Sequence, residues 1–419
     1  MILKLAAVFA LVVILMVIRA PISVAIAAGA ILIGILFPMS VLEIGKTFLS
    51  SLISFHTINL LVVVYLITLL GRMMRETGAL GRFATGTEYL LRGSRVGLVS
   101  APMFVGLLPM PGGALLTAPM VEEQARPHAI APGLLTYLNY WFRHIWEYFW
   151  PLYPPVILGM AILGIGYRHF LANQSFMTIA AISIGAVVLF TFVKRRRVRP
   201  QRAKGKTRSA FKDIIYGTFP VLAIVLLIAA LLAIQRFVPE ASPAGKITSR
   251  FPLSILMFAV VVFAWVIYRL PVRDAGRLLL GALDWRVLTL LVAVMFFREM
   301  LASSTALDGF GKLLESSSSA LLILLVTGLP FSVGLLVGWN QAYVVVSFPL
   351  LGPFIADQPG LIMLAYVSGF LGCLLSPAHL CLAFSREYFK ASWVSVYMWL
   401  APSVVVLAGV ALGVWLLFF

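Results

Sequence analysis

The sequence predicts an all-α polytopic membrane protein with about ten transmembrane helices plus two re-entrant hairpins, arranged as two inverted-topology repeats. Of the 419 residues, 62% are hydrophobic and only 11% are charged, whereas soluble domains average about 25% charged residues. The apolar runs have the length that a membrane-spanning helix needs, roughly 20 residues. Two of them are interrupted by proline and glycine at matching places in the two halves, which is typical of the binding site of a transporter.

Residues 1–193 form the first predicted repeat, with five spans and one hairpin. The first apolar run has no small-residue cleavage site before Arg19, so we expect it to remain as the first span. Residues 75–95 are charged and punctuated by glycine, and we expect them along the membrane interface. The other elements are spans at 2–18, 22–37 and 58–74, the hairpin at 97–123, a fourth span at 133–165 that is broken at 150–155, and a fifth span at 177–193.

A basic linker at residues 194–212 separates the two repeats. It contains ten of the 32 Lys and Arg residues of a chain with a net charge of +17. Basic segments next to spans stay in the cytoplasm and attract anionic lipid, which explains the charge better than binding to nucleic acid does. We therefore predict a multi-pass protein of the cell (inner or plasma) membrane, with membrane lipid and no nucleic acid among its partners.

Residues 213–419 form the second predicted repeat. Five spans in each half place both termini outside the cell when the linker is cytoplasmic, and the two hairpins then enter from opposite faces. The predicted elements are spans at 214–234, 253–268 and 287–300, a serine-rich arm, the hairpin at 321–355, a ninth span at 361–384 that is broken at Ser376-Pro377, and a tenth span at 394–417.

Short internal matches support a duplication. Residues 77–83 resemble 304–310, Leu108-Pro109 resembles Leu329-Pro330, and residues 135–139 resemble 364–368. The three matches keep their order and nearly the same offset, as a repeated unit requires.

Proline and glycine mark the two predicted hairpin breaks. Prolines 109 and 111 flank Met110 and are followed by Gly112 and Gly113, so the helix cannot continue there. The second half has Gly328-Leu329-Pro330 and then the polar tip Gly338 to Gln341. Backbone groups freed inside a bilayer need protein or water as partners, so such breaks usually line a cavity.

This pattern resembles the ion-transporter superfamily, which includes dicarboxylate, citrate, gluconate and arsenite carriers. The resemblance is closest to a bacterial and archaeal membrane-protein branch with the Pro-Met-Pro-Gly-Gly and Arg-His-Ile-Trp-Glu-Tyr segments. It implies secondary transport by an elevator mechanism and a homodimer. The Ser-Asn-Thr hairpin tips of the dicarboxylate carriers are replaced here by Met110 to Gly113 and by Trp339 to Gln341, which favours H⁺ over Na⁺ as the coupling ion.

Three ionisable residues lie in the fourth span, where a charge costs a few kcal/mol and so normally faces a cavity or a partner. We predict that Arg143 contacts an anionic substrate and that His144 and Glu147 couple transport to an ion. The alternative is an Arg143–Glu147 pair at i, i+4 that only locks the helix. His144 and Glu147 could also be metal ligands, but without a third ligand nearby we predict no metal.

Small and polar groups at the breaks complete the predicted site. Helix-to-helix hydrogen bonding is the other interpretation of the Ser and His residues among them. The aromatic residues from Tyr140 to Tyr153 could stack on a substrate, form an interfacial belt or simply pack. Cys373 and Cys381 are read as packing residues, too far apart along one helix for a disulfide. The predicted substrate-binding residues besides Arg143 are Pro111, Gly112, Gly113, Asn139, Asn340, Gln341, Ser368, Ser376 and His379.

The predicted function is therefore ion-coupled transport of a small anionic solute by alternating access, with no cofactor. One alternative on the same scaffold is a flippase for a lipid-linked phosphate or another amphipathic anion. A different class, an intramembrane enzyme, is disfavoured because the chain has no His-Glu-x-x-His or Gly-x-Ser-x-Gly motif. A P-loop is also missing, which argues against ATP hydrolysis by this chain.

Overall fold

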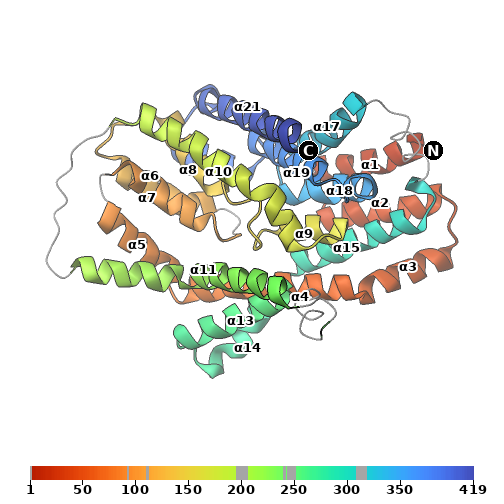
Figure 1. The fold of residues 1–419 in the computed structure, drawn as a ribbon, viewed down its shortest axis with the longest axis horizontal. Coiled ribbons are helices and arrows are strands. Elements are labelled where there is room, and N and C mark those ends of the chain that lie inside the picture. Colours follow the sequence, from red (N-terminus) through yellow and green to blue (C-terminus); the bar gives the residue numbers. More distant parts are fainter. Residues whose placement is uncertain are drawn as a thin grey trace.

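The computed structural model describes residues 2–91, 94–109, 113–194, 206–238, 242, 252–307 and 319–419. Throughout these ranges the regular structure is helical, with α-helices and one short 3-10 helix and no strand. In Figure 1, α21 lies at the top, α13 and α14 lie at the bottom, and α9, α18 and α19 lie between them.

The described residues of the first half form ten helices. Ser40 begins α3 with a capping box, since its side chain accepts from the Glu43 N–H while the Glu43 carboxylate accepts from the Ser40 N–H. Ser54 caps α4 with a single hydrogen bond, in which its side chain accepts from the Thr57 N–H. The helices are α1 (Ile2–Val17), α2 (Ile22–Leu36), α3 (Val41–Ile53), α4 (Phe55–Glu76), α5 (Ala79–Leu91), α6 (Arg95–Val105), α7 (Gly113–Ala125), α8 (Pro132–His144), α9 (Pro154–Leu163) and α10 (Tyr167–Phe192).

The second half has a similar order of long and interrupted helices. Asp284 caps α15 by accepting from the backbone N–H groups of residues 286 and 287. The elements are α11 (Lys206–Phe237), α13 (Pro252–Ile267), η1 (Val272–Asp274), α14 (Ala275–Gly281), α15 (Trp285–Ser303), α17 (Ser319–Val337), α18 (Asn340–Ile355), α19 (Pro359–Leu375), α20 (Leu380–Tyr388) and α21 (Trp393–Phe418).

Six stretches of the described chain are long and apolar enough to cross a membrane. They become seven if η1–α14 and α15, which meet at a 52° bend, count as one span. With the apolar composition, these helices confirm the predicted all-α, multi-pass membrane protein. The six stretches are Phe55–Glu76, Tyr167–Phe192, Thr207–Leu231, Ala320–Val337, Pro359–Tyr388 and Trp393–Phe418.

Packing between the halves is extensive. Helix α2 packs on α15, and α13 packs on α4. Helix α9 packs on α18, α7 on α20, and α8 on α21, so the interrupted helices of each half contact the other half. Helix α5, which lies in the predicted interfacial arm, packs along α11 (Figure 1).

The structure corrects three local expectations. Helix α8 ends at His144, before the predicted break at 150–155, so Glu147 lies in the irregular segment 145–153. Helix α11 begins at Lys206, inside the predicted linker, whose residues 195–205 lie outside the described ranges. Helix α17 continues through Pro330 and breaks only at Gly338, whereas Leu108-Pro109 lies beyond the end of α6. Proline is tolerated within a span where nearby protein groups or local helix adjustments satisfy the freed backbone carbonyl.

Candidate functional site

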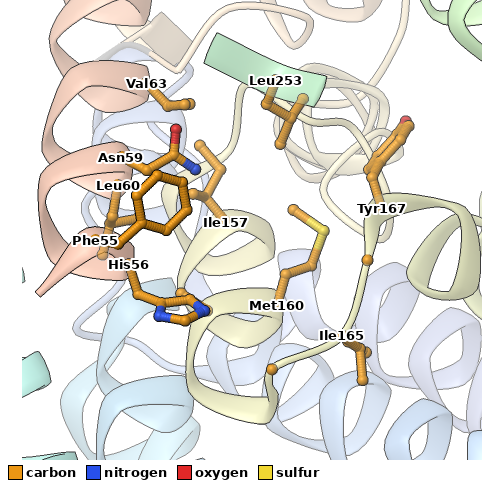
Figure 2. A pocket seen from close by; sticks show the side chains of 13 residues that line it. Phe55, His56, Asn59, Leu60, Val63, Ile157, Met160, Ile165, Tyr167 and Leu253 are labelled. Atoms are coloured by element: carbon orange, nitrogen blue, oxygen red, sulfur yellow. The ribbon is translucent and has the colours of Figure 1, made fainter. Parts of the chain in front are cut away.

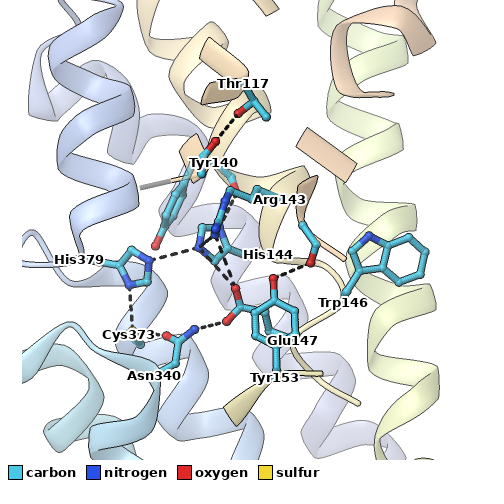
Figure 3. Close-up of polar contacts among 12 residues, drawn as sticks. Thr117, Tyr140, Arg143, His144, Trp146, Glu147, Tyr153, Asn340, Cys373 and His379 are labelled. Atoms are coloured by element: carbon cyan, nitrogen blue, oxygen red, sulfur yellow. Dashed lines mark hydrogen bonds and ion pairs between the residues drawn. The ribbon is translucent and has the colours of Figure 1, made fainter. Parts of the chain in front are cut away.

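A cluster of buried polar side chains lies where the two halves meet. Glu147, in the break after α8, is 2% exposed, and Arg143 and His144 at the end of α8 are 3% and 2% exposed. Figure 3 shows these side chains turned toward Asn340, Cys373 and His379 of the second half. The predicted charged residues are therefore brought together with two of the residues predicted from the second half.

Glu147 is held from both halves. Its Oε2 accepts from Nδ2 of Asn340, the first residue of α18. Its Oε1 lies 3.9 Å from Nη1 of Arg143 and 3.7 Å from Nε2 of His144. Its backbone carbonyl accepts from the Tyr366 hydroxyl of α19 at 2.8 Å. The Arg143–Glu147 ion pair is present, but as one part of a larger network.

The two histidines face each other across the interface between the halves. Their Nε2 atoms are 3.2 Å apart. Nδ1 of His144 lies 2.6 Å from the Tyr140 carbonyl, and Nδ1 of His379 lies 3.0 Å from Sγ of Cys373. Cys373 in turn lies 2.6 Å from Oδ1 of Asn340, which closes the network back to Glu147 (Figure 3).

Glycine allows both tip segments to approach the cluster. A Cβ on Gly113, at the start of α7, would lie 2.7 Å from Nε and Nη2 of Arg143. Gly338 has a φ of +66°, and a Cβ there would lie 2.7 Å from the His379 backbone nitrogen and the Ser376 hydroxyl. A side chain at either position would displace the polar groups beside it.

Aromatic residues in the break after α8 donate hydrogen bonds to backbone carbonyl groups at the end of α6. Trp146 donates its indole N–H to the Met103 carbonyl, and Trp150 donates to the Leu107 carbonyl, both at 2.8 Å. The Tyr153 hydroxyl donates to the Gly106 carbonyl at 2.5 Å. These carbonyls have lost their helical partners and would otherwise be costly in an apolar setting. These contacts make the aromatic side chains hydrogen-bond donors, a role beyond the stacking, belt and packing roles that the sequence suggested.

Asn139 connects three helices. Its Nδ2 donates to the Ala114 carbonyl of α7 at 3.0 Å and to the Ser385 hydroxyl of α20 at 2.9 Å, while its Oδ1 accepts from Thr117 at 2.5 Å. Both ends of the amide are therefore engaged by protein groups. This arrangement makes Asn139 a tie between helices.

Five further residues were predicted to bind substrate: Ser376, Ser368, Gln341, Pro111 and Gly112. Ser376 is buried in the break after α19, where its hydroxyl accepts from the Ala378 N–H at 3.2 Å. Ser368 donates to a carbonyl of its own helix, and Gln341 is half-buried beside Asn340. Pro111 and Gly112 lie outside the described residues.

Both cysteines lie beside ionisable side chains of the cluster, whereas their spacing in the sequence indicated only a packing role. They are free thiols, but α19 ends between them, so the axial separation expected for one helix does not apply. Continuing the match of Leu135 with Leu364 for nine residues pairs His144 with Cys373. That extension was the signal by which Cys373 could have been found.

The cluster also contains three groups of the kind that bind metal ions. One donor atom each from His144, His379 and Cys381 lies within 4.8 Å of the others, and all three side chains are buried. Two imidazoles and a thiolate are suitable ligands for zinc or copper. However, Arg143 Nη1 is 3.4 Å from His144 Nε2, and this cation opposes a metal ion at the same place.

A separate cavity of about 580 Å³ lies between α4, α9 and the start of α10 (Figure 2). Its lining is mainly apolar, and the polar side chains among its lining residues are His56, Asn59 and Tyr167. Asn59 accepts from the Ser254 hydroxyl of α13. Arg143, Glu147, His144 and His379 do not line this cavity, so it is distinct from the polar cluster.

The fold and the cluster define a multi-pass, all-α membrane protein with a buried ionisable centre between interrupted helices. The chain belongs to the family described as "Protein of unknown function (DUF401)", which it matches over residues 2–417. A comparison with curated proteins found no match.

Proposed function

We propose that this chain is an ion-coupled secondary transporter that moves a small anionic solute by an elevator-type alternating-access mechanism. The observation that carries the proposal is the buried Arg143–His144–Glu147 cluster at a helix break, completed by Asn340 and His379 from the other half. Ionisable groups at such depth are expensive and usually mark a path for a substrate or an ion. Helix breaks that meet at one place are typical of transporter sites.

Arg143 is the group in this cluster best suited to an anion. Its guanidinium remains charged and offers a planar fork that matches a carboxylate or a phosphate. It lies against Gly113, where the backbone can approach because no side chain intervenes. The start of α7 at this point adds backbone N–H groups, which favour negative charge.

We also propose that the two halves are inverted repeats, each with a re-entrant hairpin built from α6–α7 or α17–α18. The reciprocal packing supports this, because α2 on α15 has its counterpart in α13 on α4, and α9 on α18 has its counterpart in α20 on α7. The two hairpins would then enter from opposite faces. Cysteines introduced at Gly112 and at Gln341 should be reached by impermeant reagents from opposite sides. Labelling of both from one side in every condition would refute the inverted arrangement.

The coupling ion in this proposal is the proton. Glu147, His144 and His379 form a contiguous set of groups that can gain or lose one. In the test, purified protein in sealed vesicles is offered labelled dicarboxylates, citrate, gluconate, arsenite and phosphate under an imposed pH gradient and then under a sodium gradient. We expect uptake to follow the pH gradient. Uptake that follows sodium alone would refute proton coupling.

Two variants test the role of Arg143 in the same vesicles. Arg143→Ala should abolish uptake and Arg143→Lys should retain part of it, because an ammonium lacks the fork. The matched control is Arg126→Ala, which removes the same charge from an exposed pair with Glu123. Normal uptake by Arg143→Ala would refute the substrate contact. Mass spectrometry of the recovered solute distinguishes transport from catalysis, since a transporter returns it unchanged.

A further inference from the structure

The buried network contains a path of hydrogen-bonding contacts that has one contact more than it has protons. We call its members the relay. Four contacts connect them, and the path crosses between the two halves of the chain (Figure 3). In order along the path, the relay consists of Glu147, Asn340, Cys373, His379 and His144.

The proton count follows from the chemistry of each group. A carbonyl can only accept, so His144 uses its Nδ1 proton on the Tyr140 carbonyl and presents a lone pair at Nε2. When Glu147 is ionised, the Asn340 amide, the Cys373 thiol and neutral His379 each supply one proton to the path. Three protons then serve four contacts. With Asn340 donating to Glu147, the contact that has no proton of the path is the one between the two Nε2 atoms, 3.2 Å apart. The lone pair of His144 Nε2 accepts from Nη1 of Arg143 at 3.4 Å in this state.

One added proton can fill the path in two ways. It can bind between the two imidazoles, which places a second cation beside Arg143 Nη1, 3.4 Å from His144 Nε2. Alternatively it binds Glu147, which then donates to the amide oxygen of Asn340 once the amide turns over. The amide nitrogen then donates to Sγ, the thiol to Nδ1 of His379, and Nε2–H of His379 to His144. The second way avoids two adjacent cations in a buried site.

We propose that the relay binds a single proton at Glu147 and that binding reverses the direction of every hydrogen bond along it. This rests on the proposed function, for which it supplies the coupling device. Among the described residues, the charged or acidic groups outside the relay that face it include Arg143, Tyr148, Tyr153, Tyr343 and Cys381. The hydroxyls of Tyr140 and Tyr366 approach it from α8 and α19. Phenols and thiols are ordinarily neutral near pH 7, so Arg143 and Glu147 set the local charge.

Binding of a proton changes the net charge of the Arg143 and Glu147 pair from zero to positive. Before it, the Arg143 cation and the Glu147 carboxylate offset each other at 3.9 Å. Afterwards Glu147 is neutral and the charge of Arg143 is uncompensated. An anion near Gly113 is then attracted by a full charge in a site of low dielectric. The relay therefore favours binding of a proton and an anion together.

Infrared difference spectroscopy of the purified full chain during a pH titration tests the relay directly. A Cys381→Ala background leaves Cys373 as the one thiol, because the chain has two cysteines. We expect the carboxyl band of protonated Glu147 to appear, and the S–H band of Cys373 to shift at the same pH as its acceptor changes from oxygen to nitrogen. Glu147→Gln should remove both changes. An S–H band that stays fixed while the carboxyl titrates overturns the proposal, as does the lack of any carboxyl band that Glu147→Gln removes.

Two substitutions of Cys373 form a matched pair of variants that tests whether its thiol is part of the relay. Cys373→Ser keeps one donor and one acceptor and should preserve the titration of Glu147. Cys373→Ala breaks the path and should weaken proton binding about fivefold, the equivalent of one lost hydrogen bond. Identical titrations of the two variants would overturn the relay. The titrations use detergent-solubilised protein without added solute, so they do not depend on transport. A negative result in them would refute the relay, whereas a negative result for vesicle uptake would refute the proposed function.

Discussion

Removing the guanidinium of Arg143 separates a substrate contact from a structural ion pair. Nη1 of Arg143 lies 3.9 Å from Oε1 of Glu147, and both side chains are buried. At an effective dielectric constant of about 20 this separation corresponds to ~4 kcal/mol. Loss of one partner from a buried pair typically costs about 3–5 kcal/mol. We therefore expect Arg143→Ala to lower the free energy of unfolding by that amount.

The double variant Arg143→Ala with Glu147→Gln decides between the two roles. The glutamine removes the uncompensated carboxylate and can still accept a hydrogen bond from Asn340, so most of the lost stability should return. Uptake of the anion should not return, because the guanidinium is gone. Denaturant unfolding in detergent and vesicle uptake measure the two quantities. Full uptake by the double variant would refute the assignment of Arg143 as the anion contact.

The same reasoning gives a pH dependence for the single variant. Without Arg143, Glu147 can escape the cost of a buried charge by taking up a proton. The stability of Arg143→Ala relative to the unaltered chain should therefore recover as the pH falls and worsen as it rises. A stability difference that does not change with pH would show that Glu147 is not the source of the loss.

Four further substitutions test individual contacts by denaturant unfolding in detergent. Gly113→Ala places a Cβ 2.7 Å from the Arg143 guanidinium and should cost about 1–3 kcal/mol together with a loss of anion uptake. Gly338→Ala forces a side chain into a φ of +66° and should cost at least ~1–2 kcal/mol. Asn139→Ala leaves its partners on α7 and α20 unpaired, and Trp150→Phe leaves a carbonyl beyond α6 without its donor, so each should cost about 1–3 kcal/mol. An unchanged free energy of unfolding in any variant would refute the contact that it removes.

The sequence predicted the membrane class and most helix positions because the apolar runs are long and sharply bounded. Helices α1 and α2 end within a residue or two of their predicted limits, at the turns around Arg19 and Phe37. The predicted position of the break after α8 was wrong because nothing in residues 145–149 breaks a helix by itself. The bends there depend on indole contacts to α6, which are tertiary interactions that no local pattern records.

The sequence predicted some members of the buried cluster for a similar physical reason. The cost of burying charge identified Arg143, His144 and Glu147, and the helix breaks identified Asn340 and His379. Cys373 was missed because a cysteine in an apolar run usually packs as a small hydrophobic residue. Its contacts with Asn340 and His379 depend on how the two halves fit together.

The aromatic donors of the break limit how the site can open. Trp146, Trp150 and Tyr153 fasten residues 145–153 to the carbonyls at the end of α6 with three hydrogen bonds. Separating these segments in an apolar setting would expose three carbonyls at once, at a cost of several kcal/mol. We therefore expect the end of α6 and the first break to move together in the proposed transport cycle. In the proposed transport cycle, we therefore expect access to Glu147 from the side of the second half, where its carboxylate accepts from Asn340 at the start of α18.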